Sequence, residues 1–245
     1  MTLDPASPRP TQGRTYSTRR TIRLADMDAR GRLRLDALAR YLQDAAIEDV
    51  DETGWGMPDH LWYVRAMQVE VLEPPLADRE VELVTWCNGL AAVAAGRRWS
   101  VTGEAGGRIE VDSVWIHLDP DGRPARIEDF DVYAASSNGR GASTKLVLGE
   151  PGGAAGETPW HLRSSDVDLH GHVNNAVHWQ AVEHALAAGG PDPRGRLRAR
   201  LEYREPIDLG DDVALAVARH DGEALLALRA GGRTRAVAAV APLPQ

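Results

Sequence analysis

One stretch of the sequence carries the fold and the function that we expect, Asp166-Val167-Asp168-Leu169-His170-Gly171-His172-Val173-Asn174-Asn175. It gathers carboxylate, imidazole and amide side chains more closely than any other part of the chain. In an extended backbone, Asp168, His170 and His172 point to one face, and Gly171 permits a sharp turn beside them. A helix is expected to begin at Val173 or Asn174, because apolar residues then recur at helical spacing. These apolar residues are Ala176, Trp179, Val182, Ala185 and Leu186.

The plan of this stretch occurs a second time in the chain. Asp26–Gly31 matches Asp166–Gly171 at one constant offset, with its two aspartates and its glycine in the same places, and an apolar helical stripe follows both. Arg65–Pro74 resembles Arg198–Pro206, and two glutamates in each share a second, slightly smaller offset. Matching landmarks in the same order indicate an ancestral duplication.

Each copy has the pattern of one long helix followed by antiparallel strands. In the first copy we expect a strand at Tyr16–Leu24, a helix from Leu35 to about Asp51, and strands at Leu61–Leu72, Glu80–Asn88, Ala94–Glu104 and Ile109–Asp119. A helix with one apolar face is buried by such a sheet, which is an α+β arrangement. The expected organisation is a frayed tail at 1–15, an N-terminal unit at 16–135, a Gly/Ser-rich linker at 136–157 with room for a strand at Lys145–Leu148, and a C-terminal unit at 158–245.

Composition excludes several classes of protein. At 245 residues, with 43% hydrophobic and 26% charged residues, the chain has the make-up of a soluble globular protein. A formal net charge of -8 without a long basic run argues against a nucleic-acid binder. Charged residues interrupt every apolar run, so we expect no membrane span and no signal peptide. The single cysteine, Cys87, excludes an intramolecular disulfide and favours a cytoplasmic location.

The motifs together resemble those of the acyl-acyl carrier protein thioesterases, enzymes that release fatty acids from their carrier. Beside Asp166–Asn175, the resemblance includes Asp26–Gly31, Leu42–Ala46 and Leu201–Glu205, and it covers nearly the whole chain. It implies a tandem double hotdog fold and hydrolysis of fatty acyl-carrier protein. The implied partner is an acyl carrier protein with a phosphopantetheine-linked acyl chain, and no cofactor is implied.

The resemblance also suggests catalytic residues. The family uses an Asp, an Asn two residues later, a His two further on, and a Glu on the following strand. Asp168, His172 and Glu205 match three of these and are expected to be central to catalysis. His170, which stands where the family usually has Asn, is expected to assist them. An imidazole cannot both donate and accept like an amide without a specific tautomer, so we expect altered, slow or pH-shifted activity. Pro206 holds the place of a cysteine sometimes discussed as a nucleophile, which excludes a thiol there.

Thioester hydrolysis needs a nucleophile, a group that takes its proton, and donors for the developing oxyanion. Glu205 or His172 is expected to activate water. Asp168 either orients the histidine or attacks directly to give a transient mixed anhydride, and the sequence does not separate these routes. The backbone N–H groups of Val173 and Asn174 at the helix start are candidate oxyanion donors. The residues expected to bind the oxyanion or the substrate are Val173, Asn174 and Asn175.

The first copy is not expected to be catalytic. It carries Arg30 and Arg32 where the second has histidines, and arginine stays protonated near neutral pH. We therefore expect one active site per chain, with the first unit shaping the acyl pocket. Trp55, Met57 and Trp62 follow the first helix and are candidate pocket residues.

Several alternatives stay open. An acyl-CoA thioesterase and a non-catalytic acyl-binding hotdog protein are the main ones, and a hydratase is less favoured. Asp168, His170 and His172 have metal-ligand chemistry but no recognised zinc spacing, so we predict no metal site. The arginines that are either solvated strand faces or a docking surface for the acidic carrier are Arg19, Arg20, Arg23, Arg194, Arg196, Arg198 and Arg200. Pairing of two chains through sheet edges as a homodimer is also left open.

Overall fold

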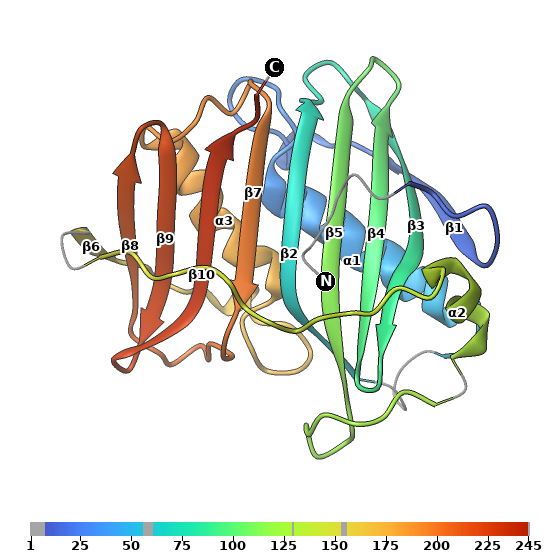
Figure 1. The fold of residues 1–245 in the computed structure, drawn as a ribbon. Coiled ribbons are helices and arrows are strands. Elements are labelled where there is room, and N and C mark those ends of the chain that lie inside the picture. Colours follow the sequence, from blue (N-terminus) through green and yellow to red (C-terminus); the bar gives the residue numbers. More distant parts are fainter. Residues whose placement is uncertain (1–7, 56–60, 129, 153–155, 245) are drawn as a thin grey trace.

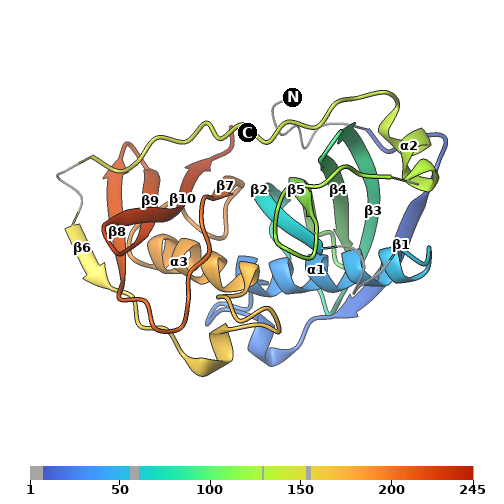
Figure 2. The same ribbon diagram turned by 90° about the horizontal axis from the view of Figure 1, so that it is seen from below.

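One antiparallel sheet, with two long helices packed on the same face, forms the molecule (Figure 1). The structure is a computed structural model, and it describes residues 8–55, 61–128, 130–152 and 156–244. The ten strands follow the order β1-β3-β4-β5-β2-β7-β10-β9-β8-β6. Figure 2 shows α1 and α3 in one layer beneath the curved sheet, while the segment that connects the two halves crosses the opposite face. This is the tandem hotdog arrangement that the sequence predicts.

The elements have the following bounds. The strands are β1 (Thr15–Thr21), β2 (Leu61–Glu73), β3 (Glu80–Ala91), β4 (Ala94–Gly103), β5 (Arg108–Leu118), β6 (Gly156–Pro159), β7 (Leu197–Tyr203), β8 (Val213–His220), β9 (Glu223–Ala230) and β10 (Arg233–Pro242). The helices are α1 (Leu35–Asp51), α2 (Asp131–Ser137) and α3 (Asn175–Ala187), with short 3-10 turns at Leu24–Asp26 and Ser164–Asp166. The predicted bounds of α1 are confirmed, and β1 to β5 each begin within one residue of the expected position.

Three local expectations differ from the structure. Helix α2 extends into the segment expected to be a linker, and no strand forms at Lys145–Leu148. The N–H groups of Val147 and Leu148 instead donate to the Glu202 carboxylate at 2.9 and 3.0 Å, so a side chain satisfies backbone donors that a strand partner would otherwise take. The first strand also begins before the predicted end of the tail, because Thr15 opens β1.

The two halves repeat the same turn before their long helices. Gly31 and Gly171 adopt φ values of 81° and 82°, in the left-handed region that suits glycine. Each glycine N–H donates to the carbonyl of the aspartate three residues earlier, at 3.0 Å in both halves. Each of these aspartates, Asp28 and Asp168, also accepts the N–H two residues on, at 2.8 and 2.9 Å. The repeated sequence landmarks thus correspond to a repeated structure.

The apolar stripe predicted on α3 is confirmed. Its five residues are at most 4% exposed, because they face the sheet and the other helix. Helix α1 contacts α3 and contributes its own buried stripe to the same core. Within the described ranges, no helix is long and apolar enough to span a membrane.

Strands β2 and β7 pair with each other and connect the two half-sheets, but the N-terminal end of β2 is not paired with β7. Residues Ala66 to Val71 of β2 pair with β7, whereas the first residues of β2 pair with β5 alone. The register of β2 shifts at Arg65, whose guanidinium donates to the Tyr203 and Arg204 carbonyls at 2.8 and 3.2 Å. Such irregularities re-aim side chains and end pairing, so an opening forms between the two half-sheets at this end.

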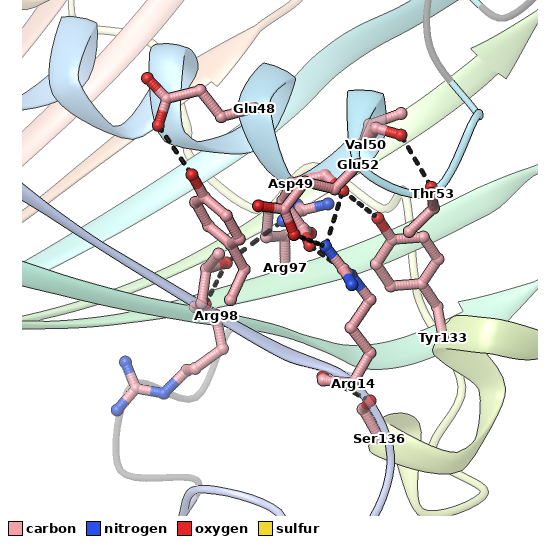
Figure 3. A network of polar contacts seen from close by, with 12 residues as sticks. Arg14, Glu48, Asp49, Val50, Glu52, Thr53, Arg97, Arg98, Tyr133 and Ser136 are labelled. Atoms are coloured by element: carbon pink, nitrogen blue, oxygen red, sulfur yellow. Dashed lines mark hydrogen bonds and ion pairs between the residues drawn. The ribbon is translucent and has the colours of Figure 1, made fainter.

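A buried charge network ties the segment before β1 to α1 and β4 (Figure 3). Asp49 in α1 is 1% exposed, and its carboxylate binds Arg14 and Arg97, each at 2.6 Å. The Tyr133 hydroxyl of α2 donates to the Asp49 carbonyl at 3.2 Å, and Ser136 donates to the Arg14 carbonyl at 2.7 Å. The network explains why α2 packs on this edge and what holds the chain in place at Arg14.

We predict that Asp49→Ala lowers the free energy of unfolding by about 3–5 kcal/mol, because it leaves the buried guanidinium of Arg97 and the half-buried one of Arg14 without their carboxylate. Glu52→Ala is the matched control, since Glu52 also binds Arg14 but is 59% exposed, and it is expected to cost about 0–1 kcal/mol. Denaturant unfolding of both variants tests this. Equal losses would show that the buried network does not hold this edge together.

Candidate active site

A cavity of about 620 Å³ opens where the two half-sheets separate, and both halves line it. The first half contributes mainly apolar side chains, among them Trp55 and Trp62, as expected for a pocket that holds an acyl chain. The second half contributes a polar wall. The predicted residues on this wall are Asp168, His170, His172, Val173, Asn175 and Glu205. Asn174 does not line the cavity, and Met57 lies outside the described residues.

Asp168 is fixed to the start of α3. Its Oδ1 accepts the His170 N–H at 2.9 Å, and its Oδ2 accepts the side-chain amide of Asn174 at 3.3 Å. The Asn174 Oδ1 in turn accepts the Ala176 N–H at 2.9 Å, so Asn174 caps the helix. Both oxygens of the Asp168 carboxylate are therefore engaged in orienting the turn and the helix start.

His172 pairs with a residue that sequence reasoning missed. Its Nδ1 lies 2.7 Å from the Asp208 Oδ1, and the two residues form an isolated antiparallel bridge. The backbone enforces this contact, because the Val173 N–H donates to the Ile207 carbonyl at 2.8 Å. With Nδ1–H donating to the carboxylate, Nε2 is the nitrogen left to accept a proton. His172 and Asp208 therefore form a histidine–carboxylate pair, in which Asp208 orients the imidazole.

Glu205 lines the cavity, but its carboxylate is bound elsewhere. It accepts hydrogen bonds from Arg235 at 2.8 Å and Arg233 at 3.2 Å. The register of β10 shifts at Arg235, whose carbonyl accepts the N–H groups of Arg204 and Glu205. This irregularity places the guanidinium beside the carboxylate. In the described part of the chain, no hydrogen bond joins Glu205 to His172.

Two of the expected oxyanion donors are already used. The Val173 N–H donates to the Ile207 carbonyl and the Asn174 N–H to the Asp166 carbonyl, both at 2.8 Å. In this structure, both N–H groups therefore serve the pairing that holds the turn. The Asn175 N–H has no acceptor among the described residues. It is the donor at the helix start that remains available to a ligand, and Asn175 lines the cavity.

His170 lies at the rim, where its side chain is exposed. Tyr63 of β2 also lines the cavity, and the pKa of its hydroxyl is raised, first by burial and then by the nearby charges of Asp168 and Asp208. Across the described ranges, no three His, Cys, Asp or Glu side chains are grouped as a metal site would require.

His178 is a buried histidine in the cavity wall. It is 4% exposed, its Nδ1 lies 3.2 Å from the Asn174 carbonyl, and its ring meets the Tyr203 ring edge-on. Burial lowers its pKa to about 4, against a weaker opposing effect of the Asn174 carbonyl. The Tyr203 hydroxyl accepts from Trp179 at 3.0 Å and donates to the Asn175 carbonyl at 3.1 Å. These contacts hold the first turn of α3 in place.

We predict that His178 makes stability depend on pH. As pH falls from 6.5 to 4, the unfolded chain binds a proton on this histidine while the folded chain does not. The unfolded state binds more protons in this window, so the free energy of unfolding falls, by up to about 3 kcal/mol for this group. Denaturant unfolding should show this extra loss in the wild type relative to His178→Gln, with parallel curves above pH 7. Equal slopes below pH 6.5 would contradict it.

Comparisons with known proteins agree with this architecture. The chain is 30% identical over 233 residues to an uncharacterised protein of Mycobacterium tuberculosis, covering 94% of this chain and 93% of that protein. It is 24% identical to the chloroplastic oleoyl-acyl carrier protein thioesterase 1 of Arabidopsis thaliana over 82% of this chain and 63% of that protein.

Solved structures share the fold. A putative oleoyl thioesterase from Lactobacillus plantarum superposes with a TM-score of 0.77 at 16% identity, covering 96% of this chain and 99% of that chain. The 12:0-ACP thioesterase from Umbellularia californica gives 0.75 at 16% identity, covering 94% and 98%. The model of the acyl-ACP thioesterase N-terminal domain matches residues 13–135, and that of the C-terminal domain matches residues 150–236. The chain therefore belongs to the acyl-ACP thioesterase family.

Proposed function

We propose that this chain hydrolyses fatty acyl-carrier protein to a free fatty acid and the carrier thiol, with His172 as the general base. Family membership supports the reaction class. The observation that carries the assignment of roles is that His172 lines the polar wall of a cavity whose remaining walls are largely apolar, while its Nδ1 lies 2.7 Å from the Asp208 carboxylate. A thioester bound there has its carbonyl beside the imidazole and its alkyl chain among apolar side chains.

The proposed reaction begins with attack of water on the thioester carbonyl carbon. His172 Nε2 takes a proton from this water, while Asp208 holds the ring and stabilises the imidazolium. The negative oxygen of the tetrahedral intermediate accepts the Asn175 N–H at the positive end of α3. The carbon–sulfur bond then breaks, and the imidazolium returns its proton to the leaving thiolate. Asp208 is a positioning residue, since it acts through the histidine.

Asp168 serves better as an organiser of the site than as the nucleophile. Each of its carboxylate oxygens accepts a hydrogen bond, from His170 and from Asn174. These bonds stabilise the carboxylate and reduce its reactivity toward a carbonyl carbon. We therefore favour attack by water over a mixed anhydride on Asp168.

The acyl chain is proposed to lie in the first half. Trp55, Trp62 and Phe130 form an aromatic cluster at the cavity, with ring centroids 4.8 to 6.1 Å apart. Aromatic rings of this size give a long alkyl chain a large apolar surface.

The carrier is proposed to approach beside Arg65 and Arg204. These residues and Glu205 line both the main cavity and a second one of about 580 Å³, which also contains Arg233 and Glu150. A basic rim suits an acidic carrier. Arg204 is ion-paired with Glu150 at 2.7 Å and Arg233 with Glu205 at 3.2 Å, so Arg65 is the cation of this rim without a carboxylate partner among the described residues. Of the arginines first considered for docking, four are also ion-paired within the chain: Arg19, Arg20, Arg198 and Arg200. We also propose a cytoplasmic location, consistent with the single buried cysteine.

We predict that His172→Ala lowers kcat/KM for acyl-carrier protein by about 10²–10⁴-fold, the usual contribution of a general base. Asp208→Asn is expected to lower kcat and to change its pH profile, because the imidazolium loses its partner. The matched control is His220→Ala, since His220 also contacts an aspartate, at 3.0 Å, but is 88% exposed and lies outside the cavity. Release of carrier thiol from substrates of several chain lengths is the measurement.

Three results would change the proposal. If Glu205→Gln abolishes turnover while Asp208→Asn does not, then Glu205, and not Asp208, is the carboxylate that His172 needs for catalysis. Faster turnover of acyl-CoA, unaffected by added free carrier protein, would identify an acyl-CoA thioesterase. Binding of acyl carrier without thiol release at any chain length would identify a non-catalytic acyl-binding protein.

A further inference from the structure

The duplication places one residue of the first half opposite the active site of the second. Helices α1 and α3 pack against each other, and Glu183 of α3 reaches the start of α1. Glu183 in α3 corresponds to Gln43 in α1, at the same offset in the sequence that separates the two glycine turns. Gln43 lines the main cavity together with His172 and Asn175. The two positions are structural equivalents with different side chains.

At the start of α1, in the first half, a carboxylate from α3 fills the equivalent place. The Glu183 Oε1 accepts the Leu35 N–H at the start of α1, at 2.6 Å. Its other oxygen binds the guanidinium of Arg32, which is 2% exposed. Leu35 and Arg32 are the equivalents of Asn175 and His172 at the same offset. An anionic oxygen of the protein itself therefore occupies the first half's helix start.

In the second half, the same place is open. The Asn175 N–H has no acceptor among the described residues, and in the same ranges the Gln43 side chain makes no hydrogen bond. An amide in place of a carboxylate removes the negative charge that would occupy the helix start, and it supplies an N–H donor instead. The position of the Glu183 oxygen against Leu35 N–H thus marks, by the internal symmetry, where a carbonyl oxygen fits against Asn175 N–H.

From this we infer that Gln43 of the first half binds the thioester carbonyl oxygen, with its side-chain amide donating alongside the Asn175 N–H as the oxygen becomes an oxyanion. The inference rests on the proposed hydrolytic function and extends it, since the active site is then built from both halves. It also explains why the first half is inactive: Glu183 and Arg32 fill the place that the substrate takes in the second half.

The test compares Gln43→Ala, Gln43→Glu and the wild type, using thiol release from acyl-carrier protein and thermal unfolding. Gln43→Ala is expected to lower kcat by about 10²–10³-fold with little change in KM, as for loss of one oxyanion donor. Gln43→Glu is expected to abolish turnover yet raise Tm by about 2–4 °C, because the new carboxylate caps α3 as Glu183 caps α1. The control is Asp44→Asn, the next residue of α1, which is exposed and should leave kcat unchanged.

Each result has a distinct meaning. Normal kcat in Gln43→Ala, in a wild type that hydrolyses the substrate, overturns the inference while the proposed function stands. If the Tm of Gln43→Glu is lower than that of the wild type, Gln43 is not the equivalent of Glu183 at the start of α3, whatever the activity of the variant. No thiol release by the wild type defeats the proposed function, and the role of Gln43 falls with it.

Discussion

The structure depends on one hydrogen-bonded turn that occurs in both halves. An aspartate carboxylate accepts the N–H two residues later, and a glycine with positive φ lets the chain fold back before a long helix begins. The turn fixes where α1 and α3 start relative to the strand that follows each of them. Because the unpaired N–H groups of a helix lie in its first turn, the aspartate also fixes where an anionic oxygen can bind.

Function then follows from how the two copies differ at equivalent positions. The first half closes its helix start with Glu183 and Arg32, and this ion pair ties α3 to α1. At the start of α3, His172 of the second half and Gln43 of the first half stand at the equivalent positions, and the same place is part of a cavity of about 620 Å³. The same backbone geometry thus holds a largely buried ion pair in one half and an open site in the other. On the proposed function, the first half supplies the apolar walls and Gln43, and the second half supplies His172 and the start of α3.

Much of this was predictable from local patterns. Apolar spacing of about 3.6 residues gives α1 its bounds at Leu35–Asp51, and the Asp and Gly landmarks mark both turns. The partner of His172 was not predictable in the same way. Asp208 is distant from it in the sequence and meets it only because the backbone beyond β7 pairs with the turn.

The sequence also did not show which hydrogen-bond donors and acceptors of the site already have partners within the protein. The Val173 and Asn174 N–H groups stand at a helix start in the sequence, but their acceptors come from elsewhere in the fold. Glu205 lies just beyond the end of β7 and not on the strand, and the register shift at Arg235 determines which cation it binds. Residue type and spacing identify the site, whereas long-range pairing decides which of its donors and carboxylates are free.

The most direct measurement is a crystal structure of the wild-type protein with a non-hydrolysable acyl-phosphopantetheine amide. The account predicts that the amide carbonyl oxygen lies within hydrogen-bond distance of the Asn175 N–H, with His172 Nε2 facing the carbonyl carbon and the acyl chain against Trp55 and Trp62. A carbonyl oxygen bound away from the start of α3, or an acyl chain lying outside the first half, would contradict it.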